Sequence, residues 1–99
     1  MEIKTQLDGS KLTVALSGRL DTTTAPKFEE QLKASLPGVS DLTLDFSELD
    51  YISSAGLRVL LSAQKSLNAS KGTMRVVGAN EIVKEIFDVT GFSDILTIE

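Results

Sequence analysis

The sequence predicts an α/β domain built on a largely parallel β-sheet, because its apolar residues switch repeatedly between two spacings. Segments with strand-like alternation are followed by segments with apolar residues three and four positions apart, as in a helix. The order is hairpin, helix, strand, helix, strand, helix, strand. Alternation of this kind indicates parallel strands joined by right-handed crossovers. The 99 residues suit one domain, spanning residues 1–99, with about three or four helices.

The first predicted element is a β-hairpin. Apolar and polar residues alternate over residues 3–7 and again over residues 12–16, and Asp8-Gly9 between them is a strong signal for a tight turn. A two-residue loop at this position pairs Ile3 with Val14, Thr5 with Leu12, and Leu7 with Ser10. This register places the apolar side chains on one face, so the pattern and the turn agree.

A polar break at residues 18–26 precedes the first helix. Any of its three threonines can cap a helix, and Pro26 suits a first helical turn. From Ala25 onward the apolar residues follow helical spacing. Pro37-Gly38 then ends the helix.

The central segment, residues 42–61, joins a strand to a second helix. Its first part alternates strictly, and from Leu57 the leucines follow helical spacing until Lys71-Gly72. Residues 51–56 form a short polar joint between the two. This joint places Ser53 and Ser54 at the helix N-terminus, where backbone N–H groups lack helical partners and the helix dipole is positive.

Two interpretations of Ser53 and Ser54 remain open from their position. A serine at a helix start is most often a cap. Two consecutive serines, however, are more than one cap requires. A phosphate on one hydroxyl would be well placed to accept hydrogen bonds from the unpaired N–H groups.

The last third of the chain predicts a strand, a helix and a final strand. Residues 74–77 form a short apolar run that ends at Gly78, and residues 79–90 follow helical spacing. Gly91 followed by Phe92 predicts a glycine C-cap with its accompanying apolar contact. Residues 95–98 complete the set as the last strand.

Composition argues against several classes of function. The chain has no Cys and no His, which removes disulfides, thiolate nucleophiles, Cys or His metal sites and Ser-His-Asp triads, so we expect no enzyme. A net charge of −4 with dispersed basic residues argues against nucleic acid and anionic membranes as partners. No apolar run approaches the ~20 residues that span a bilayer, and no signal peptide is evident. We therefore expect a cytoplasmic protein without membrane insertion.

The segment Ile52-Ser-Ser-Ala-Gly-Leu57, set between a strand and a leucine-rich helix, resembles the phosphorylation segment of STAS-domain anti-sigma-factor antagonists. In that family the acceptor serine precedes Ser, Thr or Ala and then Gly-Leu, which corresponds to Ser54. Most close relatives carry Asp before that serine, whereas this chain has Ser53, which is the second candidate.

A second run, Gly18-x-Leu-Asp-x-x-Thr-Ala25, resembles the family's loop beside the acceptor serine. There Asp21 corresponds to an aspartate associated with phosphorylation and kinase contact. The other interpretation of Asp21 is a loop aspartate that helps to cap the helix. The short motif gains its value from appearing together with the serine segment.

The resemblance covers essentially the whole chain and implies the STAS fold, a small β-α superhelix. The element order alone would also suit a small flavodoxin-like domain, but the glycine-rich phosphate loop and the acidic phosphoacceptor of such domains are not evident. The implied partner-binding residues are Asp21, Thr22, Thr23, Ser53, Ser54, Ala55, Gly56 and Arg58.

The resemblance also implies the partners and the switch. The unmodified protein would bind an anti-sigma factor that is itself a serine kinase, phosphorylation of Ser54 would end the complex, and a PP2C-type phosphatase would reverse it. ATP belongs to the kinase, so no cofactor is expected for this chain. The alternative is a STAS scaffold, or a subunit of a lipid-transport or signalling complex, that is never phosphorylated.

Charge in the neighbouring sequence indicates the direction of the switch. Between Lys33 and Arg58 the chain has four acidic residues and no basic one. A phosphate on Ser54 would therefore find few partners beyond helix N–H groups and Arg58. We expect it to disturb a docking surface rather than to reorganise the domain.

Overall fold

The sheet has five strands in the order β1-β2-β3-β4-β5, with β1 antiparallel to β2 and all other neighbours parallel. The computed structural model describes residues 1–99. The predicted α/β class, hairpin and largely parallel sheet are confirmed. The elements are β1 (Glu2–Asp8), β2 (Lys11–Leu20), α1 (Ala25–Ser35), β3 (Asp41–Ile52), α2 (Ser54–Ala69), β4 (Thr73–Val77), α3 (Glu81–Thr90), the 3₁₀ segment η1 (Phe92–Asp94) and β5 (Thr97–Ile98).

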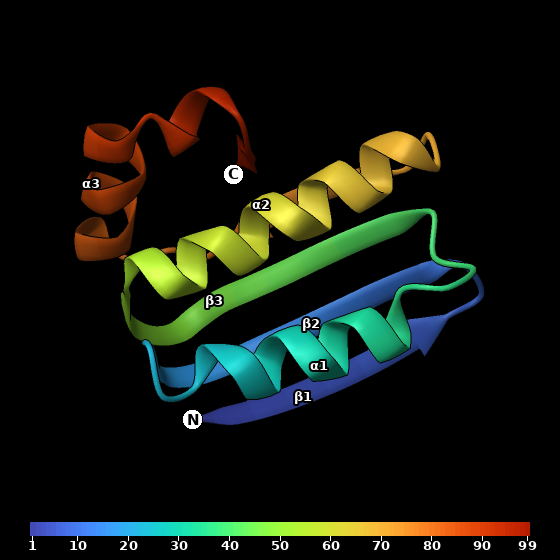
Figure 1. Cartoon of the computed structure of the whole chain (residues 1–99), viewed down its shortest axis with the longest axis horizontal. Helices are drawn as coiled ribbons and strands as arrows, with labels where there is room; N and C mark the ends of the chain where they lie inside the picture. The colour runs from blue at the N-terminus through green and yellow to red at the C-terminus, as the bar shows by residue number, and fades with distance from the viewer.

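Helices α1 and α2 lie side by side over one face of the sheet (Figure 1). The crossovers have the same hand, and each joins two strands that are neighbours both in the sequence and in the sheet. Successive helices therefore lie on the same face. Beneath the helices the strand side chains are buried and apolar, among them Leu12, Val14, Leu42 and Leu44. The opposite face carries polar side chains and is not covered by a helix.

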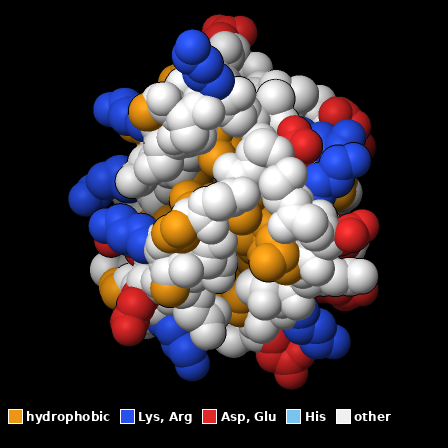
Figure 2. All heavy atoms as spheres, turned by 90° about the vertical axis from the view of Figure 1, so that its right-hand side faces the viewer, with side chains coloured by type: hydrophobic (Ala, Val, Ile, Leu, Met, Phe, Trp, Pro, Cys, Tyr) orange, Lys and Arg blue, Asp and Glu red, His pale blue; other side chains and the backbone are white.

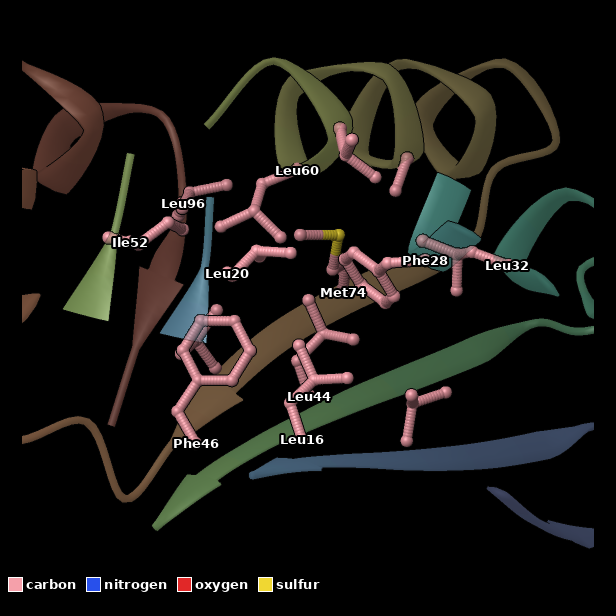
Figure 3. Close-up of a cluster of buried hydrophobic side chains, with 14 of the residues drawn as sticks. Leu16, Leu20, Phe28, Leu32, Leu44, Phe46, Ile52, Leu60, Met74 and Leu96 are labelled. Carbon is pink, nitrogen blue, oxygen red and sulfur yellow. The ribbon is translucent and has the colours of Figure 1, made fainter. Parts of the chain in front are cut away.

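The core fills the space between the sheet and the two helices (Figure 3). Phe28 from α1 and Leu60 from α2 point toward Leu16, Leu44 and Met74 on the strands. All five side chains are at most 3% exposed. No helix of the chain has both the length and the apolar character needed to cross a membrane.

Helix α3 lies at the end of the sheet where α2 begins (Figure 1). Asn80 caps it, because its Oδ1 accepts the N–H of Val83 at 2.8 Å while its Nδ2 donates to the carbonyl of Leu49 at 3.1 Å. Gly91 ends it at φ +80°, so the predicted glycine C-cap is confirmed. Ile82 is nevertheless 58% exposed, so the sheet covers only part of the apolar face of α3.

The hairpin turn lies one position later than predicted. The loop is Gly9-Ser10, which leaves Asp8 opposite Lys11, and the predicted register is therefore wrong by two residues. Gly9 has φ +62° at the first loop position, as a type II′ turn requires. A shift of two residues keeps the same side chains on the same face, so the predicted facing is unchanged. The observed pairs are Ile3 with Leu16, Thr5 with Val14, and Leu7 with Leu12.

The predicted polar joint at residues 51–56 is also corrected. Strand β3 continues to Ile52 and α2 begins at Ser54, so only Ser53 connects them. The β2–β3 register shifts twice near the ends of these strands, which breaks the strict alternation. Leu49 and Ile52, three positions apart, are consequently both buried. The period-two spacing that predicts the strand therefore ends where these irregularities begin, before the strand itself ends.

The final strand is shorter than predicted. Residues 92–94 form a 3₁₀ turn, and β5 comprises only Thr97–Ile98. Ile95 is 48% exposed, because it lies before the paired residues rather than within the sheet. This edge of the sheet is therefore closed by two residues only.

The end of the molecule opposite the start of α2 carries a shallow hollow between the end of α1 and the end of α2. Leu36, Val39 and Leu67 line it together with Lys33 and several serines. Apolar side chains are visible there between polar ones (Figure 2). Basic side chains predominate along the left of this view, whereas acidic and basic side chains alternate on the right (Figure 2).

Gln64 provides a test of the core. Its side chain is 9% exposed, Nε2 donates to Asn68 Oδ1 at 3.0 Å, and Oε1 is buried without a partner. An unsatisfied buried acceptor costs about 1–3 kcal/mol, so Gln64→Met should stabilise the fold by about 1 kcal/mol and raise Tm by about 4–8 °C. Thermal denaturation measures this, with Lys65→Met at an exposed position of α2 as a near-neutral control. A lower Tm for Gln64→Met would show that Oε1 has a partner such as water.

Candidate functional site

The two serines at the start of α2 have different roles. Ser53 is the N-cap, with extended backbone, and its Oγ accepts a long hydrogen bond of 3.5 Å from the N–H of Gly56. Its carbonyl accepts the N–H of Leu57 at 2.9 Å. Ser54 is the first helical residue, and its exposed hydroxyl makes no hydrogen bond to the rest of the chain. Capping is therefore assigned to Ser53, and Ser54 is left with a free hydroxyl.

Gly56 fixes the first turn of α2 against the strand ends. A Cβ at this position would lie 2.8 Å from Ile52 Cγ1 and 2.8 Å from Leu20 Cγ, which is closer than side chains approach. Leu20 and Ile52 are at most 1% exposed and have no room to move. Glycine at this position therefore sets how closely Ser53 and Ser54 approach the end of β2.

The loop between β2 and α1 is organised by Asp21. Its Oδ1 accepts the N–H of Thr23 at 3.0 Å, the hydroxyl of Thr23 at 2.7 Å and the N–H of Thr24 at 3.2 Å. The expectation that a threonine side chain caps α1 is wrong. Thr24 holds the N-cap position without a side-chain cap bond, and its hydroxyl donates to the carbonyl of Arg19 at 2.8 Å.

These hydrogen bonds lower the pKa of Asp21 below its ordinary value of 3.8, the hydroxyl of Thr23 having the largest effect. Because the folded pKa is lowered, this carboxylate favours the folded loop above pH 3.8 and loses that effect as the pH falls through the lowered value. Near neutral pH the carboxylate is fully charged. The interpretation of Asp21 as a residue that shapes the helix start thus has direct structural support.

The Asp21 loop and the two serines come together at one end of the sheet. Leu20 pairs with Ile52, and the N–H of Ser53 donates to the carbonyl of Leu20 at 2.9 Å. The start of α1 and the start of α2 accordingly lie next to each other at the left of Figure 1. The structure thus brings together two segments that lie about 30 residues apart in the sequence.

The predicted binding residues differ in their access to solvent. Ser54 and Arg58, one helical turn apart, are exposed, whereas Gly56 is buried and supports the surface from beneath. None of the three ion pairs of the chain involves Arg58. The remaining predicted residues are exposed (Thr22, Thr23) or half-buried (Asp21, Ser53, Ala55).

Sequence analysis missed Arg19 and Tyr51. These residues are paired across β2 and β3, and the Arg19 guanidinium lies 4.5 Å from the centre of the Tyr51 ring. Arg19 Nε also lies 3.9 Å from Asp21 Oδ2. The expectation that a phosphate on Ser54 would find few partners beyond helix N–H groups and Arg58 did not take Arg19 into account. The contact between Arg19 and Tyr51 depends on the irregular pairing of the two strand ends, which the spacing of apolar residues along the sequence does not reveal.

Comparison with known proteins agrees with this architecture. The family model described as STAS domain matches residues 2–99. Among curated proteins, the putative anti-sigma factor antagonist BtrV of Bordetella bronchiseptica is 35% identical over 94% of this chain and 80% of its own length. The anti-sigma-B factor antagonist of Listeria monocytogenes is 32% identical over 100% of this chain and 87% of its own length.

Solved structures show the same fold at low identity. The anti-sigma factor antagonist SpoIIAA in its unphosphorylated form matches with a TM-score of 0.87 and 16% identity, over 99% of this chain and 88% of its own. The phosphorylated form of the Bacillus protein SpoIIAA matches with a TM-score of 0.78 and 15% identity, over 99% of this chain and 91% of its own. Together with the family match and the two curated relatives, these similarities establish that the chain belongs to the STAS domain family.

Proposed function

We propose that this chain is an anti-sigma-factor antagonist. Without phosphate it binds an anti-sigma factor and so releases a sigma factor, and phosphorylation of Ser54 ends that complex. The observation that carries the proposal is the start of α2, where Ser53 caps the helix and Ser54 remains exposed with a free hydroxyl. The names and coverage of the curated relatives support it.

The proposed partner is an anti-sigma factor that is also a serine kinase, and a PP2C-type phosphatase resets the switch. ATP is held by the kinase, so this chain carries neither a cofactor nor a catalytic group of its own. Control of a sigma factor takes place where transcription occurs, which puts the protein in the cytoplasm. The function of the chain is thus to present a surface and a hydroxyl group.

The charges around Ser54 favour phosphorylation as the off-signal. A phosphate on Ser54 adds about −1.5 to −2 charges to a segment that directly follows β3, whose last residues include the exposed carboxylates of Glu48 and Asp50. Arg58 lies one turn further along α2 and forms no ion pair, so it is the first side chain available to a phosphate on Ser54. Phosphorylation would then alter two exposed groups of the docking surface and leave the core unchanged.

The first test locates the phosphate. Incubation with the cognate kinase and ATP, followed by mass spectrometric mapping, should give full incorporation into wild type and none into Ser54→Ala. Ser53→Asn is the matched control, because asparagine keeps a helix cap, and it should be phosphorylated like wild type. Normal incorporation into Ser54→Ala would make Ser53 the acceptor, and an unmodified wild type would favour the scaffold alternative.

The second test separates docking from folding. Ser54→Asp should melt like wild type, because a carboxylate is favourable in the first turn of a helix, yet bind the anti-sigma factor about 30- to 150-fold more weakly. Calorimetry and a melting curve measure the two effects. Ser66→Asp adds the same charge to α2 about 18 Å further along the helix and should bind normally. Equal binding by Ser54→Asp and wild type would contradict the proposal.

The third test addresses Asp21. Asp21→Ala should increase amide exchange at Thr23, since its N–H loses its acceptor, and less at Thr24, whose N–H also donates to the backbone carbonyl of Asp21 at 3.2 Å. Asp21→Asn retains an oxygen acceptor but removes the charge, and we expect normal exchange with slower phosphorylation of Ser54. Wild-type phosphorylation of Asp21→Asn, with the loop intact, would show that the carboxylate does not contact the kinase.

A further inference from the structure

The two edges of the sheet differ in a way that the proposed function does not use. At one edge β5 has two residues, which blunts that edge against further pairing. At the other edge β1 has seven residues, Glu2–Asp8, and pairs only with β2. All of β1 except the half-buried Ile3 is exposed. The chain thus has one long free strand edge.

The register of the hairpin determines which backbone groups face outward on β1. Asp8 and Lys11 flank the two-residue loop and therefore form a hydrogen-bonded pair, so even-numbered residues of β1 bond to β2. A hydrogen bond of Ser10 supports this alternation independently. Its carbonyl accepts the N–H of Ser40 at 2.8 Å on the β3 side, as expected if even-numbered residues of β2 face β3 and odd-numbered residues face β1. The N–H and C=O groups of Ile3, Thr5 and Leu7 consequently point to solvent.

An apolar side chain accompanies these free groups. Leu7 is 62% exposed, although its partner across the hairpin, Leu12, is 3% exposed. Odd-numbered residues of β1 lie on the helix-covered face, but the helices reach only far enough to bury β2 and part of Ile3. A further strand beside β1 would cover Leu7 and satisfy the outward backbone groups.

We propose that a second copy of this chain supplies that strand, by antiparallel pairing of β1 with β1. Outward groups at odd positions restrict the registers to those that pair odd with odd residues. Pairing centred on Lys4 opposes two lysines, and pairing centred on Thr5 opposes Glu2 to Asp8. Pairing centred on Gln6 instead places Lys4 opposite Asp8 twice, by symmetry, and sets Leu7 beside Thr5. Charge complementarity therefore selects the Gln6-centred register.

Lys4 near the middle of an exposed strand would ordinarily protect the edge against pairing. In the Gln6-centred register the same lysine gains the carboxylate of Asp8 as a partner. Its charge therefore favours this register over the Lys4-centred one, in which two lysines face each other. The pairing is isologous and closes as a dimer. Its two-fold axis points the two Ser54 ends in opposite directions, which leaves both docking surfaces open.

The first experiment is a charge exchange read out by sedimentation equilibrium. Wild type should associate to twice the monomer mass, and Lys4→Glu should weaken the dimer about tenfold or more, because two attractive pairs become repulsive. Adding Asp8→Lys to Lys4→Glu should restore the dimer. Lys84→Glu, which makes the same change on the exposed side of α3, is the matched control and should associate like wild type.

The second experiment uses the backbone. Thr5→Pro removes an N–H that faces solvent, so it should abolish the dimer while Tm stays close to that of wild type. Gln6→Pro removes an N–H that faces β2 and should lower Tm. Melting curves of all charge variants check that the pairing of Asp8 with Lys11, and the hollow that Lys4 and Asp45 both line, are not needed for folding.

A wild type that remains monomeric at millimolar concentration overturns the proposal. A dimer that persists in Thr5→Pro, or that the charge exchange does not restore, overturns the β1 register. The proposal is independent of the switch, because Lys4→Glu should be phosphorylated on Ser54 at the wild-type rate. Loss of phosphorylation in that variant would instead indicate that β1 contacts the kinase.

Discussion

The close approach of Gly56 to Leu20 and Ile52 positions the end of the sheet that carries Ser53, Ser54 and the Asp21 loop. Three elements meet at this contact: the end of β2, the end of β3 and the first turn of α2. Because Leu20 and Ile52 are almost completely buried, the helix start has one position relative to the strands. The N–H of Ser53 then reaches the carbonyl of Leu20, and the Asp21 loop follows directly.

The same contact explains why two neighbouring serines differ. Ser53 has extended backbone because it leaves a strand, and its side chain turns toward the first helical N–H groups. Ser54 has already entered the helix, where its own hydroxyl is directed outward and capping is not required of it. Ser54 therefore presents an exposed hydroxyl that makes no hydrogen bond to the rest of the chain.

The sequence predicted the parts of the fold that depend on spacing and on single residues. Element order, the buried face of each strand and the Gly91 cap all follow from local patterns. The hairpin register could not be predicted in this way, because Asp8-Gly9 and Gly9-Ser10 both offer a glycine to a two-residue loop and differ in which loop position the glycine occupies. The irregular β2–β3 pairing also escaped, since it depends on contacts between residues about 30 positions apart.

The candidate site was predictable to the same extent. Ser54 and Asp21 were identified from short motifs, and the structure places their segments together. The role of Asp21 in holding Thr23 and Thr24 was an open alternative, because three nearby threonines offered the same capping chemistry. Arg19 and Tyr51 had no motif at all, and only the paired strand ends reveal their contact.

A sheet with sequential strand order separates its ends from its edges. The ends of parallel strands gather loops and helix starts from β2 and β3, which is where Ser54 and Asp21 lie. The edges expose backbone groups whose direction is perpendicular to the strands, as at β1. A modification at an end therefore changes charge without touching an edge, and association through β1 leaves the end accessible. The proposed assembly through β1 and the proposed switch at Ser54 would therefore use separate surfaces of the molecule.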